Sequence, residues 1–330
     1  MTVQQRLLQT LADGELHSGS ELAAGLGITR SAVWKQIKNL KALGIEVDAQ
    51  AGQGYRLNAP HELLELQAIQ RELTEASLSL LEELNLSWMS ESTSNELLQQ
   101  APPNAGSARV FLAEYQSAGR GRRGRNWYAP AGHSICLSVG WTYATSPADF
   151  SCLGLAVGIA TLRAVKRAGV THAQLKWPND VVAAGKKLAG VLIDVQGEAG
   201  GPLYIVVGVG VNYRLSDQVR NAVNNDAGLE PISLAELSEN TLVGRNVFAA
   251  NLIDEIIRVL AEFSNDGFGQ LVDEWDAADC LSGNKLEVTQ NDKTLTGIAR
   301  GITSDGRLKL DTGNEMHLLV SGDVSLRKDS

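Results

Sequence analysis

Cysteine is scarce in this chain, with Cys136, Cys152 and Cys280 as the only thiols among 330 residues. They are odd in number and widely spaced, and no Cys-x-x-Cys pair occurs, so neither a disulfide framework nor a zinc site is predicted. We expect all three to be buried apolar residues. The five histidines show no metal-ligand spacing either, and we assign no metal that the protein holds by itself.

Long apolar runs are missing as well. No stretch approaches the roughly 20 residues of a membrane-spanning helix, and the first residues lack the basic and then hydrophobic regions of a signal peptide. We therefore expect no membrane association and a cytoplasmic location. The apolar content of 44% is ordinary for a globular protein, and the length favours two or three domains.

Positive charge is in short supply overall, because the formal net charge is −9 at pH 7. The shortage is uneven. Residues 1–60 hold six Lys and Arg against five Asp and Glu, so the remaining chain carries −10. The N-terminal segment is therefore the part best suited to meet a polyanion such as DNA.

Three short helices are predicted in that segment. The first covers residues 4–12, and the second begins at a capping box formed by Ser18 and Glu21 and stops at Gly27. Thr29 can cap a third helix over residues 30–43. Two helices joined by a turn of about three or four residues have the helix-turn-helix spacing, which leaves the second helix free to enter the major groove.

A hairpin follows these helices. Residues 45–49 alternate like a strand, residues 51–54 form a glycine-rich turn, and residues 55–57 return, as in the wing of a winged helix. The alternative is a small helical protein-interaction module. The candidate contacts to bases or phosphates are Ser31, Trp34 and Lys35, and the candidate contacts to the DNA backbone are Lys38 and Arg56.

Four arginines lie within the six residues 120–125, separated by glycines, and form the most informative motif. Glycine weakens helices and strands, so residues 114–127 are predicted to be a mobile loop. Arginine offers fixed charge and a planar fork of donors that matches carboxylates and phosphates. The pattern predicts a lid that closes over an anionic small molecule. A disordered RNA-binding segment and a solvated surface turn are the alternatives.

Three neighbouring strands are expected to bring further polar groups to one region. Residues 175–180 end a strand at a proline and supply Lys176, Asn179 and Asp180; the strand over residues 186–194 supplies Lys187; and residues 203–212 end at Asn212. The first of these segments could also be a plain turn. Several connections are too short for parallel crossovers, so the sheet is predicted to be mixed.

The remaining segments complete the expected architecture. Residues 63–84 are predicted to be helical, and residues 90–98 place hydroxyls and an amide at a strand-to-helix junction, where Thr93 or Ser94 could also be simple helix caps. Residues 246–263 have the apolar spacing of a core helix. Short strands after residue 280, separated by turns that include Asn291-Asp292, suggest a small SH3-like barrel.

The arginine motif resembles the signature loop of biotin protein ligases, because residues 119–127 match the family pattern Gly-Arg-Gly-Arg-x-Gly-Arg-x-Trp in full. The resemblance covers nearly the whole chain and implies an α+β protein. It implies a winged helix-turn-helix over residues 1–62, a mixed-sheet ligase domain similar to class II synthetases over 63–279, and the SH3-like barrel over 280–330, as in the bifunctional biotin protein ligase and biotin operon repressor.

The resemblance also implies roles for residues. Those expected to bind biotin are Thr93, Ser94, Asn95, Gln116, Arg120, Gly121, Arg122 and Lys187, and of these Arg120, Arg122 and Lys187 are expected to be catalytic. Those expected to bind ATP are Lys176, Asn179, Asp180, Asn212 and Arg327. Two departures stand out. The family order Ser-Thr-Asn is Thr93-Ser94-Asn95 here, and residues 213–234 contain no tryptophan that could stack on adenine.

The implied reaction is activation of biotin by ATP and Mg²⁺ to biotinyl-5′-AMP, followed by transfer to a lysine of biotin carboxyl carrier protein. The metal would be held through the ATP phosphates. The residue types suit this chemistry, because cations must offset the repulsion between a carboxylate and the α-phosphate. Lys187 is then a charge stabiliser rather than a nucleophile.

The fusion to a DNA-binding domain implies a second role as a repressor of biotin biosynthesis genes. A persistent adenylate would order the arginine loop and promote a homodimer that binds a palindromic operator. The strand over residues 191–195 and the turn over 197–201 are the candidate dimer edge. The rival functions are a biotin-sensing transcription factor without ligase activity and a lipoate ligase-like enzyme, whose Arg-Arg-x-Ser-Gly-Gly-Gly pattern is absent.

Overall fold

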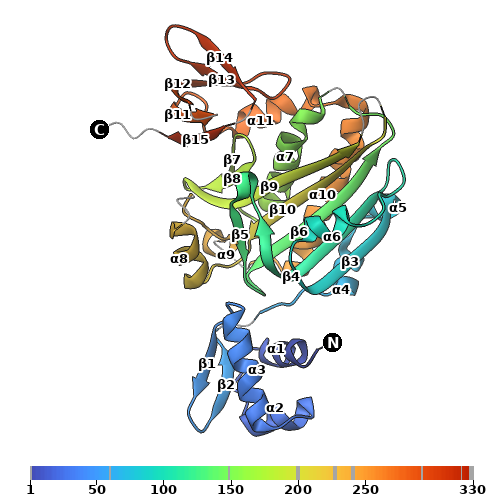
Figure 1. Ribbon diagram of the computed structural model, residues 1–330, viewed down its shortest axis with the longest axis vertical. Helices are drawn as coiled ribbons and strands as arrows, with labels where there is room; N and C mark the ends of the chain where they lie inside the picture. The colour runs from blue at the N-terminus through green and yellow to red at the C-terminus, as the bar shows by residue number, and fades with distance from the viewer. Residues whose placement is uncertain are drawn as a thin grey trace.

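The structure is a computed structural model that describes residues 2–58, 61–147, 149–197, 201–225, 229–238, 242–290, 293–320 and 322–326. An N-terminal helical unit and a C-terminal sheet lie at opposite ends of a central sheet (Figure 1). This arrangement confirms the predicted α+β class. None of the described helices combines the length and apolar character needed to cross a membrane.

The N-terminal unit has the predicted three helices and hairpin. They are α1 (Val3–Leu11), α2 (Gly19–Leu26), α3 (Arg30–Ala42), β1 (Val47–Gln50) and β2 (Gly54–Leu57). Ser18 and Glu21 form the capping box of α2, which ends at a left-handed Gly27. Thr29 Oγ1 accepts a hydrogen bond from the Ala32 amide at 3.2 Å and caps α3. The local cap signals therefore set the helix boundaries.

The central sheet is mixed, as expected. Its strands run in the order β3-β4-β6-β10-β9-β8-β7, with β5 paired to β4 outside this path, and β3 and β4 are parallel while the other described pairs are antiparallel. The strands are β3 (Leu81–Ser90), β4 (Ala108–Arg120), β5 (Asn126–Ala129), β6 (Ser134–Tyr143), β7 (Gln174–Lys176), β8 (Asp180–Ala183), β9 (Lys186–Gly197) and β10 (Leu203–Asn212).

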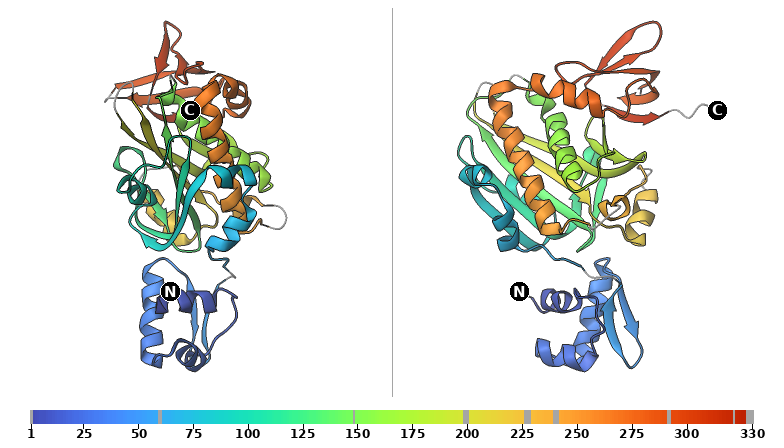
Figure 2. Two further views of the ribbon diagram at one scale, coloured as in Figure 1. Left: turned by 90° about the vertical axis from the view of Figure 1, so that its right-hand side faces the viewer. Right: turned by 180° about the vertical axis from the view of Figure 1, so that it is seen from behind.

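Two long helices, α7 (Leu153–Arg167) and α10 (Arg245–Asp266), cover one face of this sheet (Figure 2, right). Their apolar sides form the main core with the inner residues of β6, β9 and β10. The other helices are short: α4 (Leu66–Glu72), α5 (Glu75–Leu80), α6 (Thr93–Leu98), α8 (Asp217–Asn225), α9 (Leu234–Leu237), α11 (Val272–Ala278), η1 (Arg122–Gly124), η2 (Phe150–Cys152) and η3 (Gly269–Leu271). The opposite face carries the short helix α6, which packs on β4, β6 and β10.

The helix predicted over residues 63–84 is wrong in its details. Two short helices, α4 and α5, occupy residues 66–80, and β3 begins already at Leu81. Tertiary structure ends the helical segment there, because Leu81 pairs with Ala108 at the start of the parallel ladder between β3 and β4. A pairing partner far along the chain decides this boundary, and the local sequence does not reveal it.

The C-terminal unit is a five-stranded antiparallel sheet with the order β14-β13-β12-β11-β15. Its strands are β11 (Lys285–Gln290), β12 (Lys293–Ile302), β13 (Leu308–Asp311), β14 (Met316–Leu319) and β15 (Asp323–Leu326). All five predicted strands are present. No pairing between β14 and β15 closes the barrel within the described residues, and the predicted turn at Asn291-Asp292 lies outside them.

A buried polar junction joins the N-terminal unit to the core. The Arg245 guanidinium, 1% exposed, donates hydrogen bonds to Glu114 Oε1 at 2.7 Å, to the Glu62 carbonyl at 2.6 Å and to the Ser134 carbonyl at 2.9 Å. The Glu62 carboxylate accepts from Asn246 Nδ2 at 2.6 Å. This junction fixes the linker against β4, β6 and α10.

Candidate active site and DNA-binding surface

A cavity of about 650 Å³ opens on the face of the central sheet that carries α6, opposite α7 and α10. The elements around it are the β4–β5 hairpin, the β7–β8 turn, the middle of β9 and β10, the start of α6, and parts of α8, β11 and β15. The cavity therefore collects residues from the central sheet and from the C-terminal sheet. The sequence-predicted side chains that line it are Thr93, Ser94, Gln116, Arg120, Arg122, Lys176, Asn179, Asp180, Lys187 and Asn212, together with the backbone of Gly121.

The arginine segment is mostly a hairpin, which corrects the prediction of an unpaired loop. β4 continues to Arg120 and β5 begins at Asn126, with Gly119 opposite Trp127. A Cβ on Gly119 would lie 2.4 Å from the Trp127 carbonyl oxygen, so glycine permits the close approach of the strands. Only residues 121–125 form the connecting turn, in which Arg123 has a φ of 56°. Glycine thus allows pairing here instead of preventing it.

Trp127 closes the hairpin onto the floor of the cavity. A Cβ on Gly210 would lie 2.3 Å from Trp127 Cε2, so the indole rests directly on the β10 backbone. The floor also contains Gly190 and Gly208, and a Cβ on Gly208 would lie 2.7 Å from Ser94 Oγ. These three glycines therefore let Lys187, Ser94 and Trp127 lie directly against the backbone of β9 and β10.

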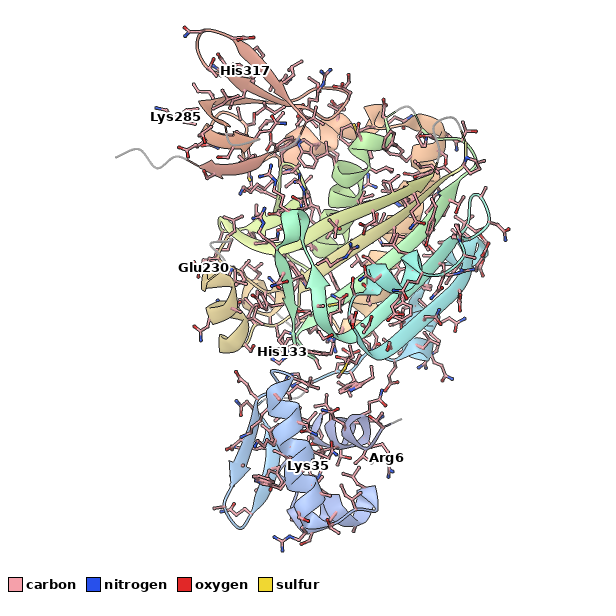
Figure 3. The ribbon with its side chains drawn as sticks, in the orientation of Figure 1. Arg6, Lys35, His133, Glu230, Lys285 and His317 are labelled. Atoms are coloured by element: carbon pink, nitrogen blue, oxygen red, sulfur yellow. The ribbon has the colours of Figure 1, made fainter. Side chains whose placement is uncertain are left out.

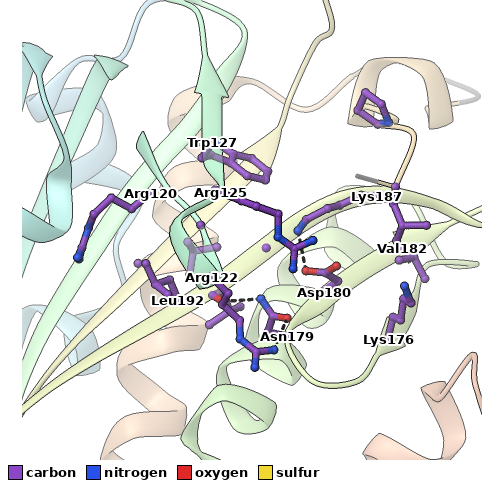
Figure 4. Close-up of a pocket in the computed structure, with 18 of the residues that line it drawn as sticks. Arg120, Arg122, Arg125, Trp127, Lys176, Asn179, Asp180, Val182, Lys187 and Leu192 are labelled. Atoms are coloured by element: carbon purple, nitrogen blue, oxygen red, sulfur yellow. Dashed lines mark hydrogen bonds and ion pairs between the residues drawn. The ribbon is translucent and has the colours of Figure 1, made fainter. Parts of the chain in front are cut away.

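Lys187 and Asp180 form an ion pair on this floor. Lys187 Nζ lies 2.8 Å from Asp180 Oδ1 and 5.8 Å from the centre of the Trp127 ring. Figure 4 shows this pair facing the arginine hairpin, with Arg125 extending into the same space. Lys176 lies nearby, where burial lowers its pKa and the charge of Asp180 opposes that shift. Cationic groups from three elements thus meet around one carboxylate.

The side chains of Asn179 and Asn212 in the site form hydrogen bonds within the protein. Asn179 donates from Nδ2 to the Val191 carbonyl at 2.9 Å, and its Oδ1 accepts a hydrogen bond from Arg122 Nη1 at 3.1 Å. Asn212 donates from Nδ2 to the Lys187 carbonyl at 3.1 Å. Asn179 therefore holds Arg122 over the cavity, and Asn212 ties the end of β10 to the start of β9.

Arg120 takes a different direction from Arg122. Its guanidinium forms an ion pair with Asp194 on β9, and Figure 4 shows it pointing away from Lys187 and Asp180. The two arginines thus attach the hairpin to the sheet at separate points, one through Asp194 and one through Asn179.

Hydroxyl groups gather at the other end of the cavity. Ser138 Oγ on β6 lies 2.7 Å from Thr93 Oγ1 and 3.0 Å from Ser94 Oγ, and Gln116 Oε1 accepts from the Thr93 amide at 2.8 Å. The alternative that Thr93 or Ser94 caps the helix is wrong, because the N-cap of α6 is Ser92. Both hydroxyls are instead used within the cavity wall. Asn95 is half-buried in the first turn of α6 and is not among the lining residues.

Several residues of the site were not predicted from the sequence. Leu192 lines the cavity from β9, and Ser138 on β6 and Asp194 on β9 contact the lining residues Thr93 and Arg120 without any local motif. Arg125 and Trp127 belong to the arginine motif, whose spacing could have identified them. Arg327 and residues 198–200 of the predicted dimer turn lie outside the described residues. Cys136 and Cys152 are buried as predicted, whereas Cys280 is half-buried beside the cavity.

No group of three or more His, Cys, Asp or Glu side chains suitable for a metal ion occurs in the described part of the chain. Among the described lining residues the acidic side chain is Asp180 alone. A divalent cation would therefore need most of its ligands from a bound molecule.

The candidate DNA surface is the outer face of α3. Val33, Ile37 and Leu40 face the core, so Ser31, Trp34, Lys35 and Lys38 are exposed on the opposite side. Figure 3 labels Lys35 on α3. The Trp34 ring is 59% exposed and lies 5.8 Å from Lys38 Nζ. Arg56 on β2 pairs with Asp48 at 3.1 Å. The face combines basic groups with one large apolar ring.

Family models match along the chain in the same order as the three structural units. The HTH domain matches residues 3–56, the Biotin/lipoate A/B protein ligase family matches residues 87–212, and the Biotin protein ligase C terminal domain matches residues 282–327.

Relatives from several bacteria resemble the chain over most of its length. A bifunctional ligase/repressor BirA of Escherichia coli is 33% identical over 99% of this chain and 98% of the relative. The Bacillus subtilis protein of the same name is 27% identical over 96% of this chain and 95% of its own length. A biotin–[acetyl-CoA-carboxylase] ligase of Mycobacterium tuberculosis is 36% identical over 71% of this chain and 85% of the relative.

The fold is also similar to that of a solved structure. Biotin protein ligase from Aquifex aeolicus, solved in complex with biotin and ATP, aligns with a TM-score of 0.60 and 22% identity over 76% of this chain and 99% of the other. The three matched domains and the Escherichia coli relative, 33% identical over nearly the whole chain, show that the chain belongs to the biotin protein ligase family, in the form that carries an N-terminal HTH domain.

Proposed function

We propose that this protein activates biotin with ATP to biotinyl-5′-AMP, transfers the biotinyl group to a lysine of biotin carboxyl carrier protein, and represses biotin biosynthesis genes when it holds the adenylate. The observation that carries the proposal is the convergence of the arginine hairpin and Lys187 on one cavity, with hydroxyl groups at its other end. The proposed domains are residues 1–62, 63–279 and 280–330.

The hydroxyl end of the cavity suits the polar ring of biotin. Thr93, Ser94 and Gln116 present hydroxyl and amide groups that can both donate and accept, and Asn95 follows them in the first turn of α6. The biotin carboxylate would then point along the glycine floor toward Lys187. The proposed biotin-binding residues are Thr93, Ser94, Asn95, Gln116, Arg120, Gly121, Arg122 and Lys187.

Activation joins two anionic groups. A biotin carboxylate oxygen attacks the α-phosphorus of ATP, the bond from that phosphorus to the bridging oxygen breaks, and pyrophosphate leaves with the electron pair. Arg122 and Lys187 lower the repulsion between the groups, because both cations lie in the cavity before the reaction. Arg120 lowers the same repulsion once its guanidinium leaves Asp194 and pairs with the substrate carboxylate. The proposed catalytic residues are therefore Arg120, Arg122 and Lys187.

The nucleotide is assigned to the end of the cavity near the β7–β8 turn. The proposed contacts are Lys176, Asn179, Asp180, Asn212 and Arg327. Since Asn179 uses both of its polar atoms on Arg122 and Val191, its contribution is to hold Arg122 in place. Mg²⁺ would be held through the phosphate oxygens of ATP, with Asp180 as the one carboxylate among the described lining residues, and would supply further charge neutralisation.

Transfer needs no covalent enzyme intermediate, because the mixed anhydride is already an activated acyl group. The neutral amine of the acceptor lysine attacks the biotinyl carbonyl carbon, the bond to the AMP oxygen breaks, and the amine proton is lost. Asp180 is the carboxylate placed to attract the lysine toward the anhydride. Because ATP and the operator are both inside the cell, the proposed place of action is the cytoplasm.

Exchange of labelled pyrophosphate into ATP tests the ligase function. Exchange is expected with biotin and Mg²⁺ and not with lipoate. Exchange with lipoate alone would favour the lipoate ligase alternative, and binding of biotin without exchange would favour a sensor that does not ligate. Neither alternative is favoured by the full-length ligase/repressor relatives.

The repressor function rests on the N-terminal unit and on the edge of β9. Ser31, Trp34, Lys35, Lys38 and Arg56 are the proposed DNA contacts. β9 pairs with β8 only as far as Gly190, so among the described residues the stretch from Leu192 to Gly197 pairs on one side only, with β10. This free edge suits side-by-side pairing of two chains as a homodimer.

Adenylate binding is proposed to strengthen the dimer, so that two winged helices meet a palindromic operator. Sedimentation and operator binding by the same samples, with and without a non-hydrolysable adenylate analogue, test this linkage. The analogue should raise both the dimer fraction and the DNA affinity. If neither changes, the proposed switch is wrong while the ligase assignment stands.

A further inference from the structure

The C-terminal sheet is attached to the β7–β8 turn by the side chain of Trp177. This indole is 2% exposed, and its Nε1 donates a hydrogen bond to the Gly306 carbonyl at 3.1 Å. Gly306 lies in the turn between β12 and β13, 129 residues further along the chain. A Cβ on Gly322, beside β15, would lie 3.7 Å from Trp177 Cζ3. One side chain therefore contacts two separate parts of the C-terminal unit.

The backbone makes a second attachment close by. The Cys280 amide donates to the Leu175 carbonyl at 2.9 Å, so the chain that leads into the C-terminal sheet runs alongside β7. Figure 1 shows β7 and β8 next to α11 and the C-terminal strands. The C-terminal unit is thus fixed on both sides of the turn that carries Lys176, Asn179 and Asp180.

These attachments determine one wall of the cavity. Thr289, Gly322, Val324 and Ser325 of the C-terminal unit line this wall, and Gly322 lies beside Trp177 of the β7–β8 turn. The hydroxyl group cluster lies at the far end, on α6 and β6. A shift of the C-terminal sheet would therefore change the end of the cavity near Lys176 and leave the hydroxyl end unchanged.

We propose that Trp177 is a positioning residue for the nucleotide: its indole N–H holds the C-terminal sheet in place, so that this sheet forms the wall against which ATP binds. The proposal rests on the assignment of ATP to this end of the cavity. Trp177 acts through the wall that it positions and takes no part in the chemistry.

Trp177→Phe removes the donor and keeps an aromatic ring, and the chain offers a matched control. Trp275 on α11 is equally buried, at 1% exposed, and its Nε1 has no hydrogen-bond partner among the described residues. Trp275→Phe therefore loses similar packing without losing a hydrogen bond. Differences between the two variants report the bond to Gly306.

In steady-state pyrophosphate exchange, Trp177→Phe should raise the KM for ATP about two- to tenfold, the range expected for one lost hydrogen bond, and leave the KM for biotin within about twofold. Trp275→Phe should leave both KM values unchanged, although its Tm falls. A merely structural role of Trp177 would lower kcat through loss of folded enzyme without separating the two substrates. Equal effects on both KM values, or no effect on either, would overturn the proposal.

Amide hydrogen exchange of the ligand-free protein tests the attachment without any activity. Trp177→Phe should speed exchange in the Thr303–Arg307 turn, whose amides bond within it, by the same factor of about two to ten. Trp275→Phe should leave this turn unchanged. Unaltered exchange in Trp177→Phe would overturn the attachment. If the parent protein shows no pyrophosphate exchange with biotin and ATP, the proposed ligase function is wrong. Amide hydrogen exchange still decides in that case whether Trp177 holds the C-terminal sheet.

Discussion

Arg245→Met is expected to destabilise the protein strongly, because it leaves the buried Glu114 carboxylate without its cationic partner. In the native chain the Arg245 guanidinium lies 2.7 Å from Glu114 Oε1, and both side chains are at most 4% exposed. Methionine fills much of the space and donates no hydrogen bond. Within the described part of the chain, Glu114 then keeps only the backbone donors of Leu64 and Gly132, and the carbonyls of Glu62 and Ser134 each lose a donor.

Removing one partner of a buried ion pair costs about 3–5 kcal/mol. For a unit of roughly 150–250 residues, 1 kcal/mol corresponds to about 2–4 °C in Tm, so the expected fall is roughly 6–20 °C. The control is Arg220→Met. Arg220 pairs with Glu236 at 2.7 Å, but the side chains are 32% and 40% exposed, and such surface pairs contribute at most about 1 kcal/mol.

Thermal unfolding followed by circular dichroism measures both variants. A double variant, Arg245→Met with Glu114→Gln, should recover part of the stability lost in Arg245→Met, because it also removes the unpaired carboxylate charge of Glu114. Equal small shifts for Arg245→Met and Arg220→Met would refute the argument from burial. A double variant less stable than Arg245→Met alone would show that hydrogen bonding, and not charge, dominates the junction.

Lys187→Ala should lower the rate of pyrophosphate exchange by roughly two to three orders of magnitude, since a preorganised cation is lost; a rate within threefold of the parent would contradict its role. Gly210→Ala should push Trp127 off the floor, because the new Cβ would lie 2.3 Å from the indole, and should release biotinyl-AMP that modifies free lysines at random. Gly154→Ala, where nothing lies within 4 Å, is the control and should behave like the parent. Burial lowers the pKa of His133, so the unfolded chain binds the proton more readily and stability should fall as the pH drops below about 6.5. His133→Gln should flatten the Tm profile between pH 7 and 5, and an unchanged slope would show that other groups cause it.

Features with local signals were predictable from the sequence. The caps at Ser18 and Thr29 gave the boundaries of α2 and α3 because the residues that satisfy the helix amides are three positions away at most. The strands β9 and β10 followed from their apolar runs. Most of the residues that the family resemblance assigned to biotin or ATP line one cavity.

Features that depend on distant partners were not predictable. The pairing of Gly119 with Trp127 turns a glycine-rich segment into a strand, and no composition rule anticipates it. Arg120 meets Asp194 across 74 residues, and Thr93 meets Ser138 across 45. Such contacts arise only when the sheet has formed. The sequence therefore identified the functional groups of the site but did not predict which residues they would contact.

The glycine floor limits how this site could be redesigned. At Gly190, Gly208 and Gly210 there are no side-chain atoms to remove, so truncation cannot deepen the cavity between β9 and β10. Any added methyl group at Gly208 or Gly210 collides with Ser94 or Trp127. Acids with extra bulk on that side should be rejected by every single-residue variant of these glycines. Acceptance of larger analogues would have to come from a neighbouring side chain, for example by shortening Leu192, which pairs with Gly208 across β9 and β10 and also lines the cavity.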